Sequence, residues 1–292
     1  MGWKINPLYS DEVAILEICK ENEMVFGPLW EQKLARALQW FTVILSAIFL
    51  AYYVYSTLRA TCGWEELYVC TVEFTKVVVE VYLEYVPPFM IYQMNGQHTP
   101  WLRYMEWLLT CPVILIHLSN ITGLNDEYSG RTMSLLTSDL GGIAFAVLSA
   151  LAVGWQKGLY FGIGCIYGAS TFYHAACIYI ESYHTMPAGK CKRLVVAMCA
   201  VFFTSWFMFP ALFLAGPECF DGLTWSGSTI AHTVADLLSK NIWGLIGHFL
   251  RVGIHEHILV HGDVRRPIEV TIFGKETSLN CFVENDDEED DV

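Results

Sequence analysis

Apolar blocks of about twenty residues alternate with short polar connections along most of the chain. A transmembrane helix needs roughly 20 mainly apolar residues, and seven blocks of that length are present. They cover residues 37–57, 66–89, 101–121, 133–153, 158–180, 194–215 and 228–250 or beyond. The pattern predicts an all-α membrane protein, a single seven-helix domain over residues 34–262.

Composition supports this prediction. The 292 residues are 54% hydrophobic with a mean hydropathy of +0.39, too apolar for an ordinary soluble domain. The net charge of −13 owes much to the terminal run ENDDEEDDV, typical of a solvated tail, and argues against a nucleic-acid partner. The first residues show no basic segment followed by an apolar one, so no cleaved signal peptide is expected.

Basic residues in the short connections predict the orientation. With residues 1–33 outside the cell, the outer connections hold a single basic residue, Lys157. The inner connections and the C-terminal flank hold Arg59, Arg131, Lys190, Lys192, Arg193, Arg251, Arg265 and Arg266. Lys33 and Arg36 run against the trend. The glycosylation sequon that begins at Asn120 then falls on the inner side. Residues 263–292 form a cytoplasmic tail, in which alternation around Gly274 and Lys275 indicates a small hairpin.

The last apolar block contains a lysine, Lys240, near its middle. A charge at membrane depth is expensive and usually functional. Asp236 lies four residues earlier, so on a helix its carboxylate shares a face with the ammonium group. Two interpretations stay open: a buried ion pair that fastens helices together, and a lysine that holds a cofactor.

Four glutamates line one face of the second predicted helix. Glu66, Glu73, Glu80 and Glu84 are spaced seven, seven and four residues apart, which keeps them within an arc of roughly 40° over a rise of about 27 Å. Each costs up to about 3 kcal/mol against lipid, and Lys76 offsets only part of that. A dry structural network and a water-filled path for cations are the two interpretations.

The third predicted helix carries further ionisable groups and a proline. Glu106 and His117 are eleven residues apart, about three turns, and therefore share a face. Thr110 and Cys111 precede Pro112, which removes a backbone donor and tends to kink the helix.

Buried polar and aromatic residues occur in later helices too. Asp139 lies within the fourth and needs a partner, for which a thiol or a water is suitable. Trp206 and Phe209, three residues apart in the sixth, form an aromatic wall that on its own is more often core packing.

Cysteine and histidine patterns give weaker signals. Cys19, outside the membrane, could cross-link two subunits or stay a free thiol. The HEHILVH segment lacks the H-E-x-x-H zinc motif because Leu259 stands at the second histidine position, so no metal is expected there.

Several long segments resemble the algal channelrhodopsins, a cation-conducting branch of the microbial rhodopsins. They are TCGWEELYVCTVE, WLRYMEWLLTCPVILIHLSN, SLLTSD, DLLSKNIWG and HEHILVHGD, and the similarity covers about residues 38–263. The resemblance implies that Lys240 binds all-trans retinal as a protonated Schiff base. It assigns the counterions to Glu106 and Asp236, whose charges favour the protonated imine.

The resemblance also assigns a retinal pocket, a gating pair and three constrictions. The pocket would be formed by Trp107, Thr110, Cys111, Gly164, Trp206 and Phe209, and the gating pair by Cys111 and Asp139. The central gate would be Ser46, Glu73 and Asn241; the inner gate Glu65, Glu66, His117 and Arg251; the outer pore Lys76, Glu80, Glu84 and Arg103. Many members of the family have threonine at the position of Gly142, so the resemblance does not predict the absorption colour or the channel kinetics of this chain.

The sequence thus predicts a light-gated cation channel, not an enzyme, in the plasma membrane. The resemblance implies a homodimer, with a cross-link through Cys19 as an option. A light-driven proton pump is the nearest alternative. Pumps commonly have, about three turns inward of the counterion, a carboxylic acid that returns a proton to the Schiff base, and His117 occupies that position here. An anion-conducting relative and a seven-helix ligand receptor are the others, and the acidic face of the second helix disfavours both.

Overall fold

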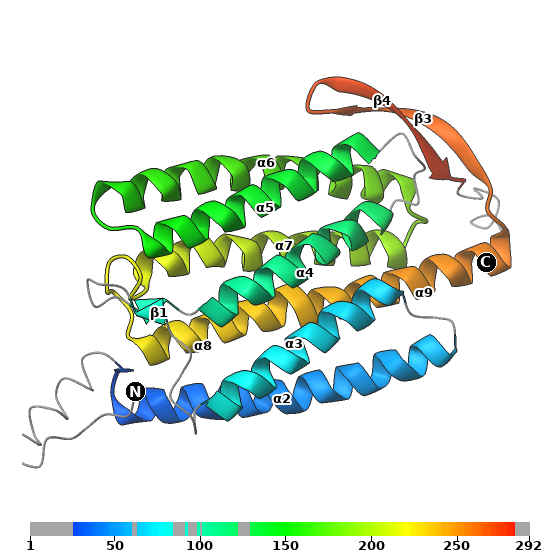
Figure 1. Ribbon diagram of the computed structural model, residues 1–292. Helices are drawn as coiled ribbons and strands as arrows, with labels where there is room; N and C mark the ends of the chain where they lie inside the picture. The colour runs from blue at the N-terminus through cyan, green and yellow to red at the C-terminus, as the bar shows by residue number, and fades with distance from the viewer. Residues whose placement is uncertain are drawn as a thin grey trace, which may run out of the picture.

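The computed structural model describes residues 26–59, 63–83, 91–92, 98–99, 101–121 and 129–283. Within them seven helical rods run side by side in one bundle (Figure 1), which confirms the predicted architecture. The first six rods are α2 (Leu29–Leu58), α3 (Trp64–Leu83), α4 (Trp101–Ile121), α5 (Ser129–Leu151), α6 (Trp155–Thr185) and α7 (Lys190–Ala215). The seventh is continuous through α8 (Trp225–Asp236), a π-helical turn η2 (Leu237–Ile242) and α9 (Trp243–His261).

Several helices extend beyond the apolar blocks. Only α4 has the bounds that hydropathy predicts. Helix α2 begins eight residues earlier than predicted, at Leu29, because Lys33 and Arg36 interrupt an apolar run without interrupting a helix. Residues 84–89 of the second predicted helix, with Glu84, lie outside the described residues.

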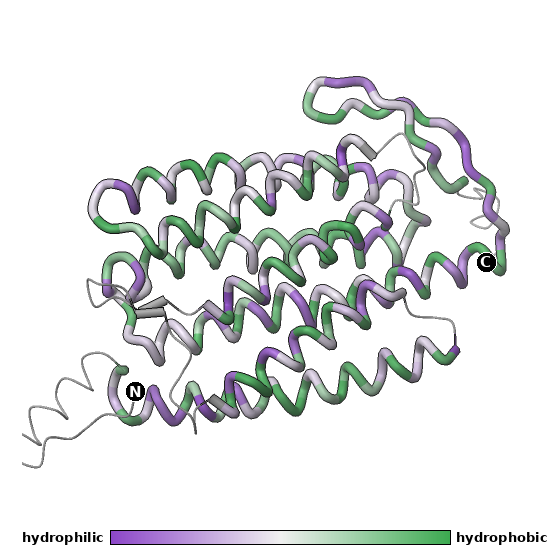
Figure 2. The backbone as a smooth tube through the Cα atoms, viewed as in Figure 1, coloured by the Kyte–Doolittle hydropathy of each residue, from purple (hydrophilic) through white to green (hydrophobic). Residues whose placement is uncertain are grey.

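The surface of the bundle is apolar and much of its interior is polar. Helix α2 buries Thr42 and Ser46 completely, whereas Ile44 and Ile48 are more than half exposed. This reverses the pattern of a soluble helix and is expected where lipid covers the outside. Figure 2 shows hydrophobic residues along the helices, with hydrophilic ones interspersed.

Five of the described helices are long and apolar enough to cross a membrane: α2, α4, α5, α6 and α7. The two remaining rods, α3 and α8–η2–α9, carry several of the buried charges described below, including Glu73, Asp236 and Lys240.

Helices α5 and α6 approach each other closely at a glycine. A Cβ atom added at Gly141 would lie 2.6 Å from the ring of Tyr167, so only glycine fits without a shift of that ring. The main apolar core lies deeper, around Leu115, Leu118 and Met198, which are fully buried.

The predicted C-terminal hairpin is confirmed. Strands β3 (Arg265–Ile272) and β4 (Lys275–Phe282) pair antiparallel, and Ile272 faces Lys275 across a two-residue turn. Both turn residues, Phe273 and Gly274, have positive φ angles, +48° and +81°, as a type I′ turn requires.

The hairpin packs on α6 through a small apolar cluster that includes Cys177, Leu279 and Cys281 (Figure 1). Burial raises the pKa of the Cys281 thiol, so this side chain packs as a protonated, unreactive group. A second, very short ladder joins β1 (Ile91–Tyr92) to β2 (His98–Thr99).

Candidate functional site

Lys240 lies in the centre of the bundle, held by carboxylates from three helices. Its Nζ is 2.5 Å from Asp236 Oδ1, 2.6 Å from Glu106 Oε2 and 3.5 Å from Glu73 Oε2. The expected stacking of Asp236 and Lys240 is confirmed, and α4 and α3 each add a carboxylate. All four side chains are almost fully buried, so these contacts are only weakly screened.

A second lysine shares Asp236. Lys76 Nζ is 2.9 Å from Asp236 Oδ2 and 3.5 Å from Glu80 Oε1. Lys76 and Glu80 were expected together in an outer pore, and the structure does pair them. It also connects Lys76 directly to the carboxylate that holds Lys240. Three buried carboxylates, Glu73, Glu106 and Asp236, therefore face two ammonium groups.

The helix that carries Lys240 is locally widened. In η2 the backbone N–H of Trp243 donates to the carbonyl of Leu238, five residues earlier instead of four. Such π turns occur often at functional sites, because the added residue reorients neighbouring side chains.

Thr110 fixes Glu106. Its hydroxyl donates to Glu106 Oε1 at 2.8 Å, while Lys240 occupies the other oxygen. Thr110 was expected in the retinal pocket, but it does not line the cavity described next. Its contact with Glu106 is the role that the structure shows.

An apolar cavity of about 300 Å³ lies among α4, α5, α6 and α7. The other five expected pocket residues, Trp107, Cys111, Gly164, Trp206 and Phe209, all line it. The rings of Trp107 and Phe209 meet edge to face, with centroids 4.8 Å apart. Within the described residues the indole N–H groups of Trp107 and Trp206 have no hydrogen-bond partner.

The expected gating pair faces the same cavity. Cys111 lines it from α4 and Asp139 from α5, together with Gly142. Asp139 Oδ2 is buried, and no hydrogen bond reaches it from the part of the chain that the structure describes. The carboxyl group is the main polar feature on an otherwise apolar lining.

The three central-gate residues come from α2, α3 and η2 and are all buried. Glu73 contacts Lys240 as described above, whereas Ser46 Oγ and Asn241 Nδ2 have no hydrogen-bond partner among the described residues. A small void of about 10 Å³, lined by Asn241 and Lys240, also touches Glu66 and His117. The central and inner groups are therefore neighbours.

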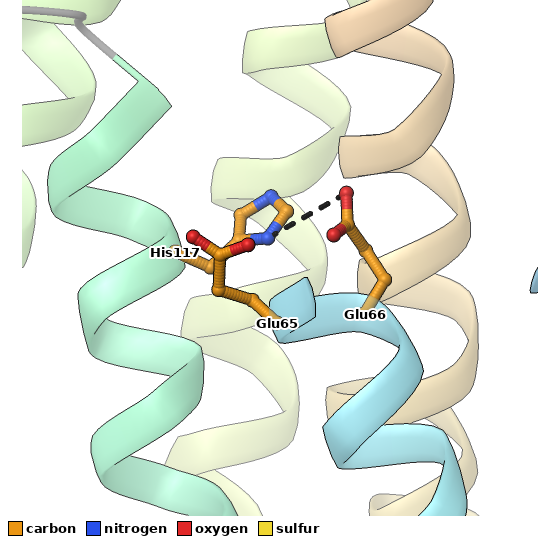
Figure 3. Close-up of side chains that lie close together, drawn as sticks. All are labelled: Glu65, Glu66 and His117. Carbon is orange, nitrogen blue, oxygen red and sulfur yellow. Dashed lines mark ion pairs between the residues drawn. The ribbon is translucent and has the colours of Figure 1, made fainter. Parts of the chain in front are cut away.

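The four inner-gate residues also come together. Arg251 Nε is 3.2 Å from Glu66 Oε1, and Arg251 Nη2 is 3.5 Å from Glu65 Oε2. His117 Nδ1 is 3.8 Å from Glu66 Oε1, the contact drawn as a dashed line in Figure 3. Asn120 Nδ2 donates to Glu65 Oε1 at 3.0 Å, a contact that no sequence pattern indicates.

The predicted outer pore contains a buried acid that sequence patterns did not single out. Arg103 Nη1 is 3.1 Å from Glu218 Oε1, and Lys157 donates to the Glu218 backbone carbonyl. Glu218 lies in the connection after α7, where no periodic pattern identifies a residue as buried. Glu84 is outside the described residues.

Side chains that could bind a metal form two groups of three within the described residues: Glu73, Glu106 and Asp236, and Glu65, Glu66 and His117. In the first group Lys76 and Lys240 supply the positive charge. The terminal histidines belong to neither group; the rings of His257 and His261 lie 4.8 Å apart near the hairpin.

Fold and site together define a class of protein: a seven-helix membrane protein whose last helix carries a buried, ion-paired lysine beside an apolar aromatic cavity. The chain belongs to the bacteriorhodopsin-like family, whose sequence model matches residues 33–254. Members of this family are multi-pass membrane proteins that bind retinal through a lysine Schiff base.

Individual relatives place the chain among rhodopsins of the channelrhodopsin type. It is similar to the red light-activated channelrhodopsin Chrimson, with 39% identity, a TM-score of 0.82, and coverage of 88% of this chain and 90% of that one. A bacteriorhodopsin of Haloterrigena sp. (strain arg-4) is 25% identical over 62% of this chain and 74% of its own. Acetabularia rhodopsin I, at 18% identity and a TM-score of 0.64, covers 77% of this chain and 96% of its own and shows the shared fold.

Proposed function

We propose that this chain is a light-gated cation channel with retinal bound to Lys240. The observation that carries the proposal is a chain of buried and partly buried ionisable groups through the bundle, with Lys240 at its centre. Glu80, Glu73 and Glu66 lie at successive levels of α3, about 10 Å apart along the helix. Glu73 contacts Lys240 itself, so the site of photochemistry and the path share a residue.

The residues present fit retinal. A long apolar polyene requires an apolar, aromatic-lined cavity, and its aldehyde requires an amine. The 300 Å³ cavity supplies the first and Lys240 the second. When bound, retinal supplies absorption of visible light and a light-driven change of shape. Glu106 and Asp236 hold the positive charge at Lys240 Nζ, and Trp107 and Phe209 supply aromatic lining of the cavity.

The acidic groups would select cations. Carboxylates in a row along a water-accessible path attract cations and repel anions. In the state described here each level is closed by a basic partner: Lys76 pairs with Glu80, Lys240 with Glu73, and Arg251 with Glu66. A change of charge or position at Lys240 breaks its ion pair with Glu73 and so weakens the closure of the path at the central level.

The 39% identity to a channelrhodopsin supports this proposal over a proton pump. A pump commonly reloads its Schiff base from a carboxylic acid about three turns inward of the counterion. Here that position is His117, close to Glu66 and Arg251. The proposal also includes insertion in the plasma membrane with the N-terminus outside, and a homodimer. Cys19, the cross-link candidate, lies outside the described residues.

Voltage-clamp recording on cells that express the chain tests the function. Light should evoke a current whose reversal potential follows external protons and sodium. A current that never reverses indicates a pump, and a reversal potential that follows chloride indicates an anion channel; either result excludes the proposal.

Absorption spectroscopy tests the retinal site independently. Lys240→Ala should abolish the visible band, because the amine is lost. Lys33→Ala, at an exposed lysine of α2, should retain it and serves as the matched control. A visible band that survives in Lys240→Ala excludes a covalent link at this residue.

A further inference from the structure

Glu65, Glu66 and His117 gather one imidazole and two carboxylates at the inner end of the bundle. Their nearest ligand atoms all lie within 4.8 Å of one another. Figure 3 shows the three side chains turned into the same space, Glu65 and Glu66 from α3 and His117 from α4. Each is at least 96% buried, so surrounding atoms restrict the movement of these side chains.

Few hydrogen-bond donors reach the two carboxylates: Asn120 donates to Glu65 Oε1, and Arg251 forms the ion pairs described above. Glu66 Oε2 and Glu65 Oε2 are buried, and no hydrogen bond reaches either atom from the described residues. A buried carboxylate oxygen without a donor is costly. The positive charge nearby comes from Arg251, whose side chain is 41% exposed and therefore free to move outward.

The geometry is close to that of a zinc site. Zinc binds histidine nitrogen and carboxylate oxygen at about 2.0–2.2 Å in a tetrahedron, which sets neighbouring ligand atoms roughly 3.3–3.5 Å apart. His117 Nδ1 and Glu66 Oε1 are 3.8 Å apart, a few tenths of an ångström too long, and the three ligand atoms together lie within 4.8 Å, so the side chains must draw together by up to about 1.3 Å around an ion. Imidazole in the set favours Zn²⁺ over Mg²⁺ or Ca²⁺, which prefer oxygen alone.

A cavity leads to the group. Its volume is about 340 Å³, and Glu65, His117 and Arg251 line it together with Arg265 and Phe282 of the hairpin. An ion can therefore reach the carboxylates and the imidazole from the end of the bundle where the hairpin lies, past Arg251, which pairs with both glutamates.

We propose that Glu65, Glu66 and His117 bind a Zn²⁺ ion that displaces Arg251 from its ion pairs. Water fills the fourth position of the tetrahedron. The ion joins α3 to α4 more tightly than the arginine does, because it bonds residues of both helices at once. If the chain conducts as proposed above, zinc applied from this side holds the inner constriction closed; this consequence rests on the proposed function.

Calorimetry on the purified full-length protein in the dark tests the binding itself, with ZnCl₂ as the titrant. One ion should bind per chain. His117→Ala and Glu66→Gln should each weaken binding at least about tenfold, while Arg251→Gln should tighten it severalfold because the competing cation is gone. His255→Ala, which changes a residue lining the same cavity, is the matched control and should leave the affinity unchanged.

Circular dichroism of each variant establishes that the helices are intact. Equal zinc affinity in the wild type and His117→Ala, or weaker binding in Arg251→Gln, overturns the proposal. Zinc in the bath of an inside-out patch then tests the consequence: light-evoked current should fall in the wild type and persist in His117→Ala. A chain that binds zinc in the calorimeter but gives no light-evoked current refutes the proposed function and leaves the metal site standing.

Discussion

Gly247 of α9 leaves the room that His117 occupies. A Cβ atom added at Gly247 would lie 2.8 Å from His117 Nε2 and 3.1 Å from Met198 Cε. The first distance is about 0.6 Å below the 3.4 Å at which ordinary contact begins. His117 has little freedom to move, because its ring packs against Trp243 with centroids 5.1 Å apart. Gly247→Ala should therefore strain the inner end of the bundle.

Gly244, three residues earlier on the same helix, provides the control. Among the described residues, a Cβ atom there would meet only Tyr53 Oη within 4 Å, at an ordinary 3.6 Å. Alanine is better than glycine inside a helix by about 0.8–1.0 kcal/mol, so Gly244→Ala should stabilise the protein by about that amount. At Gly247 the same gain is opposed by an overpacking cost of about 1–3 kcal/mol. The alanine variant at Gly247 should be less stable than the one at Gly244 by about 1–3 kcal/mol.

Equilibrium unfolding in mixed micelles, followed by circular dichroism, measures this difference in the free energy of unfolding. Each variant is compared with the wild type under the same detergent ratio. Equal stabilisation by the two alanines would refute the reasoning, since it would mean that the His117 ring does not lie against Gly247.

Two other side chains make contacts whose loss the same unfolding assay can measure. The Thr224 hydroxyl caps α8 by accepting from the Gly227 N–H at 3.0 Å, and it donates to Glu31 Oε2 at 2.6 Å. Thr224→Ala should lower the free energy of unfolding by about 0.5–2 kcal/mol, and Thr224→Ser should lower it much less because the hydroxyl remains. Equal losses in the two variants would contradict the capping role. The Trp243 indole N–H donates to Tyr179 Oη at 2.7 Å in the core. Trp243→Phe removes the donor and should lower the free energy of unfolding by about 1–3 kcal/mol. An unchanged free energy of unfolding would show that this hydrogen bond contributes nothing.

The sequence predicted the seven helices because membrane depth imposes a length and a composition on each of them. It also predicted contacts within one helix, such as Asp236 with Lys240, because a helix has a fixed period. Hydropathy placed the start of α2 too late, because a helix continues beyond the apolar stretch as long as its backbone hydrogen bonds can form.

Contacts between helices were accessible only through the resemblance to a known family. Periodicity orders the residues of α3 around its axis but does not say which neighbour faces them, so the pairing of Lys76 with Asp236 was not foreseen. Glu218 was missed because its loop has no repeating pattern, and Asn120 stood out only as part of a sequon. The π turn at Lys240 has no signature in the sequence, because its residues would equally suit a regular helix.

The charges of α3 also affect how this helix is inserted into the membrane during synthesis. Between its first turn and Glu80 this helix carries Glu65, Glu66, Glu73, Lys76 and Glu80, and it is not among the helices apolar enough to cross a membrane alone. A single charged residue at the centre of an inserting helix costs about 2.5–3.5 kcal/mol. The partners that relieve Glu73, Lys76 and Glu66 lie on the seventh rod, which is synthesised last. We therefore expect α3 to lie between its apolar neighbours until the seventh rod is made. In a chain truncated before Asp236, the α3 segment should be poorly retained in the bilayer, while the apolar helices remain inserted.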